Sequence, residues 1–98
     1  MKVYIAGRVS GLPYDQVTAK FAAAEMMLRA EEHEPVNPLK HVECQAKPAE
    51  AMKVLIPLML ECDALLLLND WEFSEGAQIE AQMARYAGMC IMNEDDLT

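Results

Sequence analysis

Basic residues are scarce in this chain of 98 residues, where eight Lys and Arg stand against sixteen Asp and Glu and give a formal net charge of -8. No run of Lys or Arg is interleaved with aromatic residues, the pattern that binding to a nucleic-acid backbone requires. We therefore expect no nucleic-acid polymer as a partner. The charge does not exclude a small anionic ligand, because backbone amides at a helix start bind phosphate without a positive net field.

Cysteine and histidine are too sparse for a disulfide framework or a metal centre. The three cysteines, Cys44, Cys62 and Cys90, are odd in number, far apart and without Cys-x-x-Cys spacing. His33 and His41 have no partners at the spacing of metal ligands or of a catalytic triad. We expect no metal, no cofactor and a reducing, cytoplasmic location.

Long apolar runs are missing as well, so no segment approaches the length of a membrane span. The residues after Met1 lack the pattern of a secretory signal, and there are no repeats or linker-like stretches. With 53% hydrophobic residues, the chain suffices for one core but not for two, because short chains bury a smaller fraction of their surface. We expect a single domain over residues 1–98, no membrane partner, and a solvated acidic tail at residues 93–96.

What is present is an alternation of short apolar runs with helical periodicity. Apolar residues recur at helical spacing from Val17 to Leu28, and the run DALLLL at residues 63–68 is apolar on both faces, which is typical of a central parallel strand. This order predicts an α/β fold, a three-layer open parallel sheet of about four strands with flanking helices, flavodoxin-like or Rossmann-like. Strands are expected at residues 2–6, 34–37, 63–68 and 89–92, and helices at residues 14–30, 48–62 and 75–87.

Three further expectations concern the helices. Pro57 should kink or restart the second helix. In the last helix, Ile79, Met83 and Tyr86 should mark the core face, with Glu80 at its edge. The eight methionines are interpreted as core filler.

Ligands of open parallel sheets bind outside the carboxyl ends of the strands, where the strand order reverses. This rule selects two loops, residues 7–11 and residues 69–76. Ser74 is a candidate N-cap of the last helix, and Gly76 lets a ligand approach the backbone closely. Because helical side chains lean toward the N-terminus, Glu80 is positioned to point into the crevice. The alternative is a solvated glutamate, the more common state on a helix.

Several segments are similar to those of a known superfamily, namely VYIAGRVSGLP at residues 3–13, VNP at residues 36–38 and SEGAQIEAQMARYAG at residues 74–88. The most specific element is the Ser-x-Gly-x-x-x-Glu spacing that ends at Glu80, together with Tyr4 and Gly7. On these motifs the chain resembles a family of small, often phage-encoded proteins in the nucleoside 2-deoxyribosyltransferase-like superfamily.

The resemblance implies an enzyme that cleaves the N-glycosidic bond of a 2-deoxynucleoside or its 5'-monophosphate, or transfers the deoxyribosyl group. It implies that Glu80, held in place by Tyr4, attacks the anomeric carbon and forms a covalent glutamyl-sugar intermediate. Trp71 would stack on the base, with a rim aromatic packed on the domain as the equal alternative. A homodimer or higher homo-oligomer is also implied. The residues that would line the sugar or phosphate are Gly7, Arg8, Ser10, Gly11, Ser74 and Gly76.

Two positions depart from the family pattern. Related sequences usually carry a second acid where this chain has Leu55, and a retaining mechanism needs a group that handles the proton. Asp70 is a candidate for this catalytic role, as are Glu72 and Glu75, and each is otherwise a loop charge. Arg8 suits bidentate phosphate recognition and favours a nucleotide over a nucleoside, with an exposed arginine at the loop mouth as the alternative.

The sequence leaves other function classes open. The second hypothesis is a catalytically inactive nucleotide-binding module that retains the ligand crevice. The third is an interaction or structural protein in which the crevice is vestigial.

Overall fold

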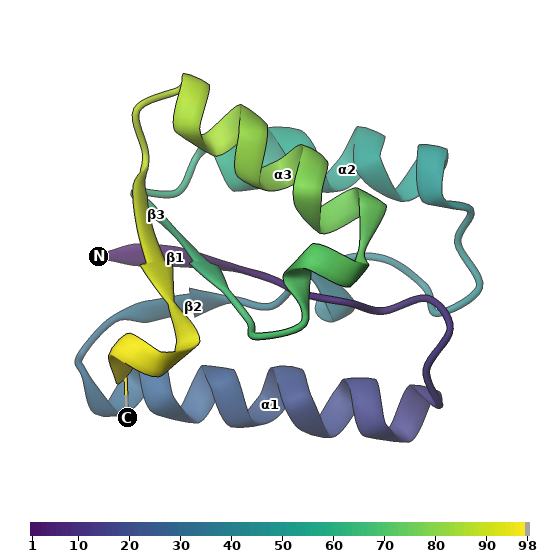
Figure 1. Ribbon diagram of the computed structural model, residues 1–98, viewed down its shortest axis with the longest axis horizontal. Helices are drawn as coiled ribbons and strands as arrows, with labels where there is room; N and C mark the ends of the chain where they lie inside the picture. The colour runs from purple at the N-terminus through teal and green to yellow at the C-terminus, as the bar shows by residue number, and fades with distance from the viewer. Residues whose placement is uncertain (98) are drawn as a thin grey trace.

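Four parallel strands form one sheet, namely β1 (Lys2–Ala6), β2 (Glu34–Val36), β3 (Ala64–Leu67) and β4 (Cys90–Asn93). The computed structural model describes residues 1–97, and the strand order is β2-β1-β3-β4 (Figure 1). Strands β1 and β3 lie at the centre and are almost entirely buried, as their apolar sequences require. The expected open parallel α/β fold is confirmed.

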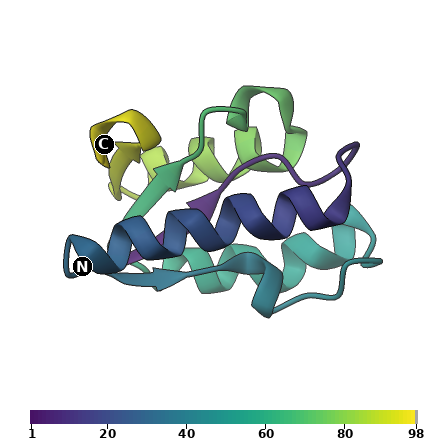
Figure 2. The ribbon, with the colours of Figure 1, turned by 90° about the horizontal axis from the view of Figure 1, so that it is seen from below.

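Three helices cover the two faces of this sheet, namely α1 (Tyr14–Ala30), α2 (Pro48–Leu60) and α3 (Glu75–Tyr86). Helix α1 lies on one face, and α2 and α3 lie side by side on the other (Figures 1 and 2). Helix α1 buries the predicted stripe from Val17 to Leu28 against the sheet. Within residues 1–97, none of the helices is both long enough and apolar enough to cross a membrane.

Side chains on β1 alternate between the two layers, as the two-residue period of a strand requires. Val3 and Ile5 pack in the core cluster with α1, whereas Tyr4 and Ala6 pack in the cluster with α2 and α3. Tyr4 is therefore placed on the face that carries α3.

The path of the chain creates a reversal of strand order between β1 and β3. From β1 the chain passes through α1 to the edge strand β2, and α2 then returns it across β1 to β3. The carboxyl ends of β1 and β3 are adjacent, because Ala6 pairs with Leu67 and the Leu68 amide donates to the Ala6 carbonyl at 2.9 Å. The loops after β1 and β3 therefore flank the crevice where such sheets bind ligands.

The predicted core face of α3 is wrong. Ile79 and Met83 are 40% and 39% exposed, and Tyr86 is 97% exposed. The helix instead buries its small residues and Glu80. Alanines have little bulk, so they let α3 pack closely on the sheet and on α2, and the large apolar residues are left outside.

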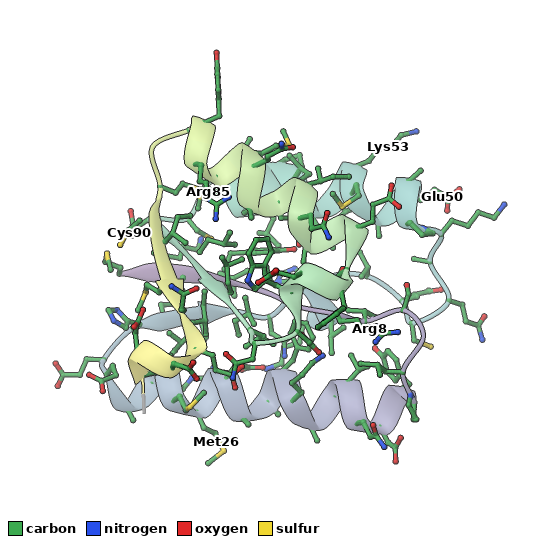
Figure 3. The ribbon with its side chains drawn as sticks, viewed as in Figure 1. Arg8, Met26, Glu50, Lys53, Arg85 and Cys90 are labelled. Carbon is green, nitrogen blue, oxygen red and sulfur yellow. The ribbon has the colours of Figure 1, made fainter. Side chains whose placement is uncertain are left out.

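Two other expectations for the helices also need correction. Helix α2 continues through Pro57 as one segment from Pro48 to Leu60, so of the two expected effects of this proline the restart does not occur. The methionines are not uniformly core filler, since Met59 is fully buried but Met26 is 72% exposed and points from α1 away from the sheet (Figure 3).

The acidic end of the chain is not a free tail. Residues Glu94–Leu97 form a short 3-10 turn after β4. The Asn69 amide donates to Oε1 of Glu94 at 2.9 Å, and the Asn93 amide donates to Oδ2 of Asp96 at 3.1 Å. Glu94 therefore connects the end of the described chain to the loop after β3, whereas Asp96 binds back to the last residue of β4.

Candidate functional site

Glu80 is a buried carboxylate that faces the sheet. Its side chain lies on the inner face of α3 and is 6% exposed. The fully buried Tyr4 donates its hydroxyl hydrogen to Oε2 of Glu80 at 2.5 Å. The predicted pairing of these two residues is therefore present, and the alternative of a freely solvated Glu80 is excluded.

The environment changes the acidity of both members of this pair. Burial raises the pKa of Glu80 to about 7, while the hydrogen bond from Tyr4 acts in the opposite direction. Burial raises the pKa of Tyr4, and the adjacent Glu80 carboxylate raises it further. Tyr4 therefore keeps its proton at neutral pH, and Glu80 is divided between its protonated and ionised forms there.

A second buried carboxylate, Glu25 on α1, provides a comparison, because its charge is balanced by neighbouring residues. Glu25 accepts hydrogen bonds from Asn37 at 2.6 Å and from Lys40 at 3.0 Å, and it lies 3.4 Å from Arg29. Burial alone would raise the pKa of Glu25, but these partners lower it. No cation forms an ion pair with Glu80 within residues 1–97. A buried acid that is kept without a counter-charge is typical of a functional site.

A cavity of about 610 Å³ opens beside Glu80 and lies between the loop after β1, the start of α3 and the first half of α2. This volume is in the range that proteins use for small ligands. Seven of the ten residues predicted for the site line the cavity, namely Tyr4, Gly7, Arg8, Ser10, Ser74, Gly76 and Glu80. Gly11, Asp70 and Trp71 do not.

The start of α3 supplies the polar wall of the cavity. Ser74 is the N-cap, as predicted, and its Oγ accepts the Ala77 amide at 3.1 Å. A Cβ atom added at Gly76 would lie 3.9 Å from the sulfur of Met52, so the backbone at Gly76 is open toward the cavity. Backbone amides at such a helix start favour anionic or hydroxyl groups of a ligand.

The loop after β1 forms the opposite lip of the cavity. At Gly7 a Cβ atom would lie 2.7 Å from Cδ1 of Leu68, so only glycine permits the close approach of the two loops. Gly11 has a φ of 84°, which glycine adopts without strain. Arg8 lies on the side of the molecule where α3 begins (Figure 3), and its Nε donates to the Ser10 carbonyl at 3.1 Å.

Asp70 belongs to a clamp between the two loops. Its Oδ1 accepts the Arg8 amide at 3.0 Å, and its Oδ2 is 2.5 Å from Nζ of Lys20 on α1. Lys20 also donates to the Arg8 carbonyl at 2.6 Å. Asp70 therefore binds the Arg8 backbone and Lys20 and does not line the cavity. Nothing in the sequence around Lys20 indicates that it binds Asp70.

Trp71 lies beside the end of α3. It is half-buried against the core cluster under α2 and α3, and its ring stands 5.8 Å from the guanidinium carbon of Arg85. This placement corresponds to the packed rim aromatic that the sequence left open as an alternative. The exposed aromatic residues that line the cavity are instead Phe73 and Tyr14, which are 75% and 41% exposed.

The wall formed by α2 and the segment before it is largely apolar and was not predicted, apart from the absence of an acid at Leu55. Leu55 is 8% exposed and lines the cavity together with Ala51 and Met52. Within residues 1–97, no group of three or more His, Cys, Asp or Glu side chains is arranged to hold a metal ion.

The fold and the site together define an open parallel α/β domain with a cavity of ligand size beside a buried acid that has no counter-charge among residues 1–97. Residues 1–93 match the family described as Domain of unknown function (DUF4406), and the chain belongs to that family. None of the curated proteins compared with the chain matches it.

Proposed function

We propose that the protein cleaves the N-glycosidic bond of a 2-deoxynucleoside or its 5'-monophosphate, or transfers the deoxyribosyl group, through a glutamyl-sugar intermediate on Glu80. The observation that carries this proposal is the pair of Tyr4 and Glu80, with Glu80 buried, without a counter-cation and open to the cavity. The resemblance at Ser74, Gly76 and Glu80 supplies the reaction class.

The chemistry follows from the geometry of the pair. An ionised Glu80 oxygen forms a bond to the anomeric carbon while the bond to the base nitrogen breaks, and the electron pair leaves with the base. Tyr4 holds the carboxylate in position by its hydrogen bond to Oε2. Water or a second base then displaces Glu80 from the sugar. Asp70, whose side chain binds Lys20, stays a candidate only as a positioning residue for Arg8.

Glu80→Gln should abolish release of free base from a panel of 2-deoxynucleosides and their 5'-monophosphates. We expect a loss on the order of 10³-fold or more, because the variant keeps the shape of the side chain but lacks the attacking charge. Release is measured by chromatography of the free base. If Arg8 binds phosphate, the monophosphates should show a lower KM than the nucleosides.

Glu75→Gln is the matched control, because Glu75 lines the same cavity from the same helix but is exposed. Its rate should fall far less than that of Glu80→Gln. Release that survives in Glu80→Gln would contradict the proposed nucleophile.

An inactive nucleotide-binding module is the second candidate, and Leu55 is the observation that favours it. With Leu55 on the wall, Glu80 is the only buried carboxylate that lines the cavity among residues 1–97. Saturable nucleotide binding without base release across the whole panel would support this candidate. A protein whose melting temperature no nucleotide raises would contradict both, because a ligand of the native state must stabilise it.

We also propose a homo-oligomer and a cytoplasmic location. The exposed apolar residues of α2 and α3 support the oligomer. The exposed free thiols of Cys44 and Cys90 favour a reducing compartment.

A further inference from the structure

Proton donors are scarce beside Glu80. Among residues 1–97, seven titratable side chains line the cavity, namely Tyr4, Arg8, Tyr14, Glu43, Cys44, Glu75 and Glu80. Only Tyr4 and Glu80 are buried, and they bind each other. Of the remaining five, Arg8 is partly exposed and the other four are exposed, and none comes from α2.

Neither member of the buried pair is suited to protonate a departing base. Glu80 must be ionised to attack carbon, so it carries no proton in that step. Tyr4 holds its proton in the hydrogen bond to Glu80, and its raised pKa opposes release. A proton given up by Tyr4 would leave a buried phenolate beside Glu80, which desolvation and charge repulsion both disfavour.

The walls of the cavity differ in polarity, so they suit different parts of a nucleotide. The start of α3 and Arg8 offer amides and a guanidinium, which suit a phosphate or sugar hydroxyls. The base is then left against the apolar wall of α2, formed by Ala51, Met52 and Leu55. These three residues have no acidic side chain that could protonate the departing base.

The charges that line the cavity favour a positively charged base. Glu43, Glu75 and Glu80 are acidic, and Arg8 is the single basic residue among the described lining residues. The chain as a whole carries a formal charge of -8. Such a field raises the local concentration of cations and lowers that of anions.

We propose that the site acts on deoxyribosides whose base leaves without a proton, that is, on positively charged N-alkylated bases such as 7-methylpurines. The proposal rests on the proposed glycosidic chemistry of Glu80. When the Glu80 oxygen bonds to the anomeric carbon, the electron pair of the broken bond neutralises the alkylated ring, and the base departs as a neutral molecule. Water then attacks the anomeric carbon, its proton passes to solvent, and the Glu80 carboxylate is regenerated. An unmodified purine would have to leave as an anion.

The test compares 7-methyl-2'-deoxyadenosine 5'-monophosphate with 2'-deoxyadenosine 5'-monophosphate, after subtraction of the spontaneous release measured with Glu80→Gln. We expect kcat/KM to be higher for the methylated nucleotide by roughly 100-fold or more, because assistance by a general acid is worth about 10² to 10⁴-fold. The rate for the methylated nucleotide should rise as Glu80 ionises, through a pH of about 7, and then stay level. Equal rates for the two nucleotides, or a rate that falls again at higher pH, would overturn the proposal.

Leu55→Asp tests the same point by adding the missing acid. Compared with Leu55→Asn, which adds a polar side chain of the same size but no acid, Leu55→Asp should raise the ratio of the rate for unmodified nucleotide to the rate for methylated nucleotide by about 10-fold or more. Circular dichroism checks that both variants fold, and if they do not, the substrate comparison and the pH profile still decide. A folded Leu55→Asp without any gain would contradict the placement of the base beside α2. No release from either nucleotide would instead refute the glycosidic function itself.

Discussion

At the scale of single residues, the difference between Glu25 and Glu80 locates the site. Both carboxylates are 6% exposed, but Glu25 has Lys40, Arg29 and Asn37 as partners, whereas among residues 1–97 Glu80 has only Tyr4. A buried charge without a counter-charge costs stability. Proteins keep such a destabilising buried acid where function requires it. We therefore assign the proposed activity to Glu80.

The stability of Glu80→Gln should exceed that of the wild type above pH 7 but not at pH 4. The pKa of Glu80 is about 7 in the folded protein against 4.5 for the free side chain. The folded state therefore holds the proton more tightly, and the free energy of unfolding falls as pH rises from about 4.5 to 7. The gain of the variant is at most about 3 kcal/mol at pH 8. It is measured by urea unfolding at pH 4, 6 and 8.

Glu75→Gln provides the comparison, because the exposed Glu75 carboxylate should give no such dependence on pH. A gain for Glu80→Gln that is the same at all three pH values would contradict the assignment of Glu80 as a destabilising buried acid.

At the scale of elements, two glycines have different tasks at the junction of loops and helices. Gly7 lies against Leu68, where a Cβ atom would be 2.7 Å from the leucine side chain. At Gly76, in the first turn of α3, a Cβ atom would come no closer than 3.9 Å to its neighbours, and this glycine borders the cavity. The first glycine serves packing, whereas the second keeps space for a ligand.

Gly7→Ala and Gly76→Ala should therefore act in opposite directions on stability. We expect Gly7→Ala to lower the free energy of unfolding by about 1–3 kcal/mol, because the added methyl group overpacks Leu68. Gly76→Ala should raise it by up to about 1 kcal/mol, since alanine is the better helix former. Gly76→Ala should nevertheless weaken nucleotide binding, measured by titration calorimetry. A stabilised Gly76→Ala with unchanged affinity would show that the ligand does not approach this turn.

At the scale of the whole molecule, several exposed apolar residues lie on the two helices that cover one face of the sheet. On α2, Val54 and Leu60 are 50% and 45% exposed, and on the adjacent α3 the exposed residues include Met83 and Tyr86. These two helices lie next to each other on the same face of the sheet (Figure 1). Exposed apolar area of this kind is typical of a surface that another chain covers.

The substitution of both Met83 and Tyr86, as Met83→Glu with Tyr86→Ser, should convert the proposed homo-oligomer into a monomer. A buried charge and the lost aromatic surface both disfavour association. Molar mass is measured by light scattering after gel filtration. Met26→Glu is the control, because Met26 is also exposed to solvent, at 72%, but lies on the opposite helix layer, on α1 (Figure 3). A wild-type monomer, or loss of the oligomer in the control alone, would contradict this assignment.

The sequence by itself determined the order of strands and helices, the parallel sheet and the candidate acid. Short apolar runs and the N-cap Ser74 act locally, so their effects can be inferred from residues close in the chain. The position of Glu80 in α3 can be inferred in the same way, because it lies six residues after this N-cap.

Only the tertiary structure decided which face of α3 is buried, which partners Asp70 binds and what lines the cavity. Lys20 and Asp70 are 50 residues apart, and the cavity combines side chains from β1, α2 and α3. The burial of alanines in place of Ile79 and Met83 likewise depends on how closely α3 approaches its neighbours. These features arise from packing between segments distant in sequence, so local propensity and periodicity contain no information about them.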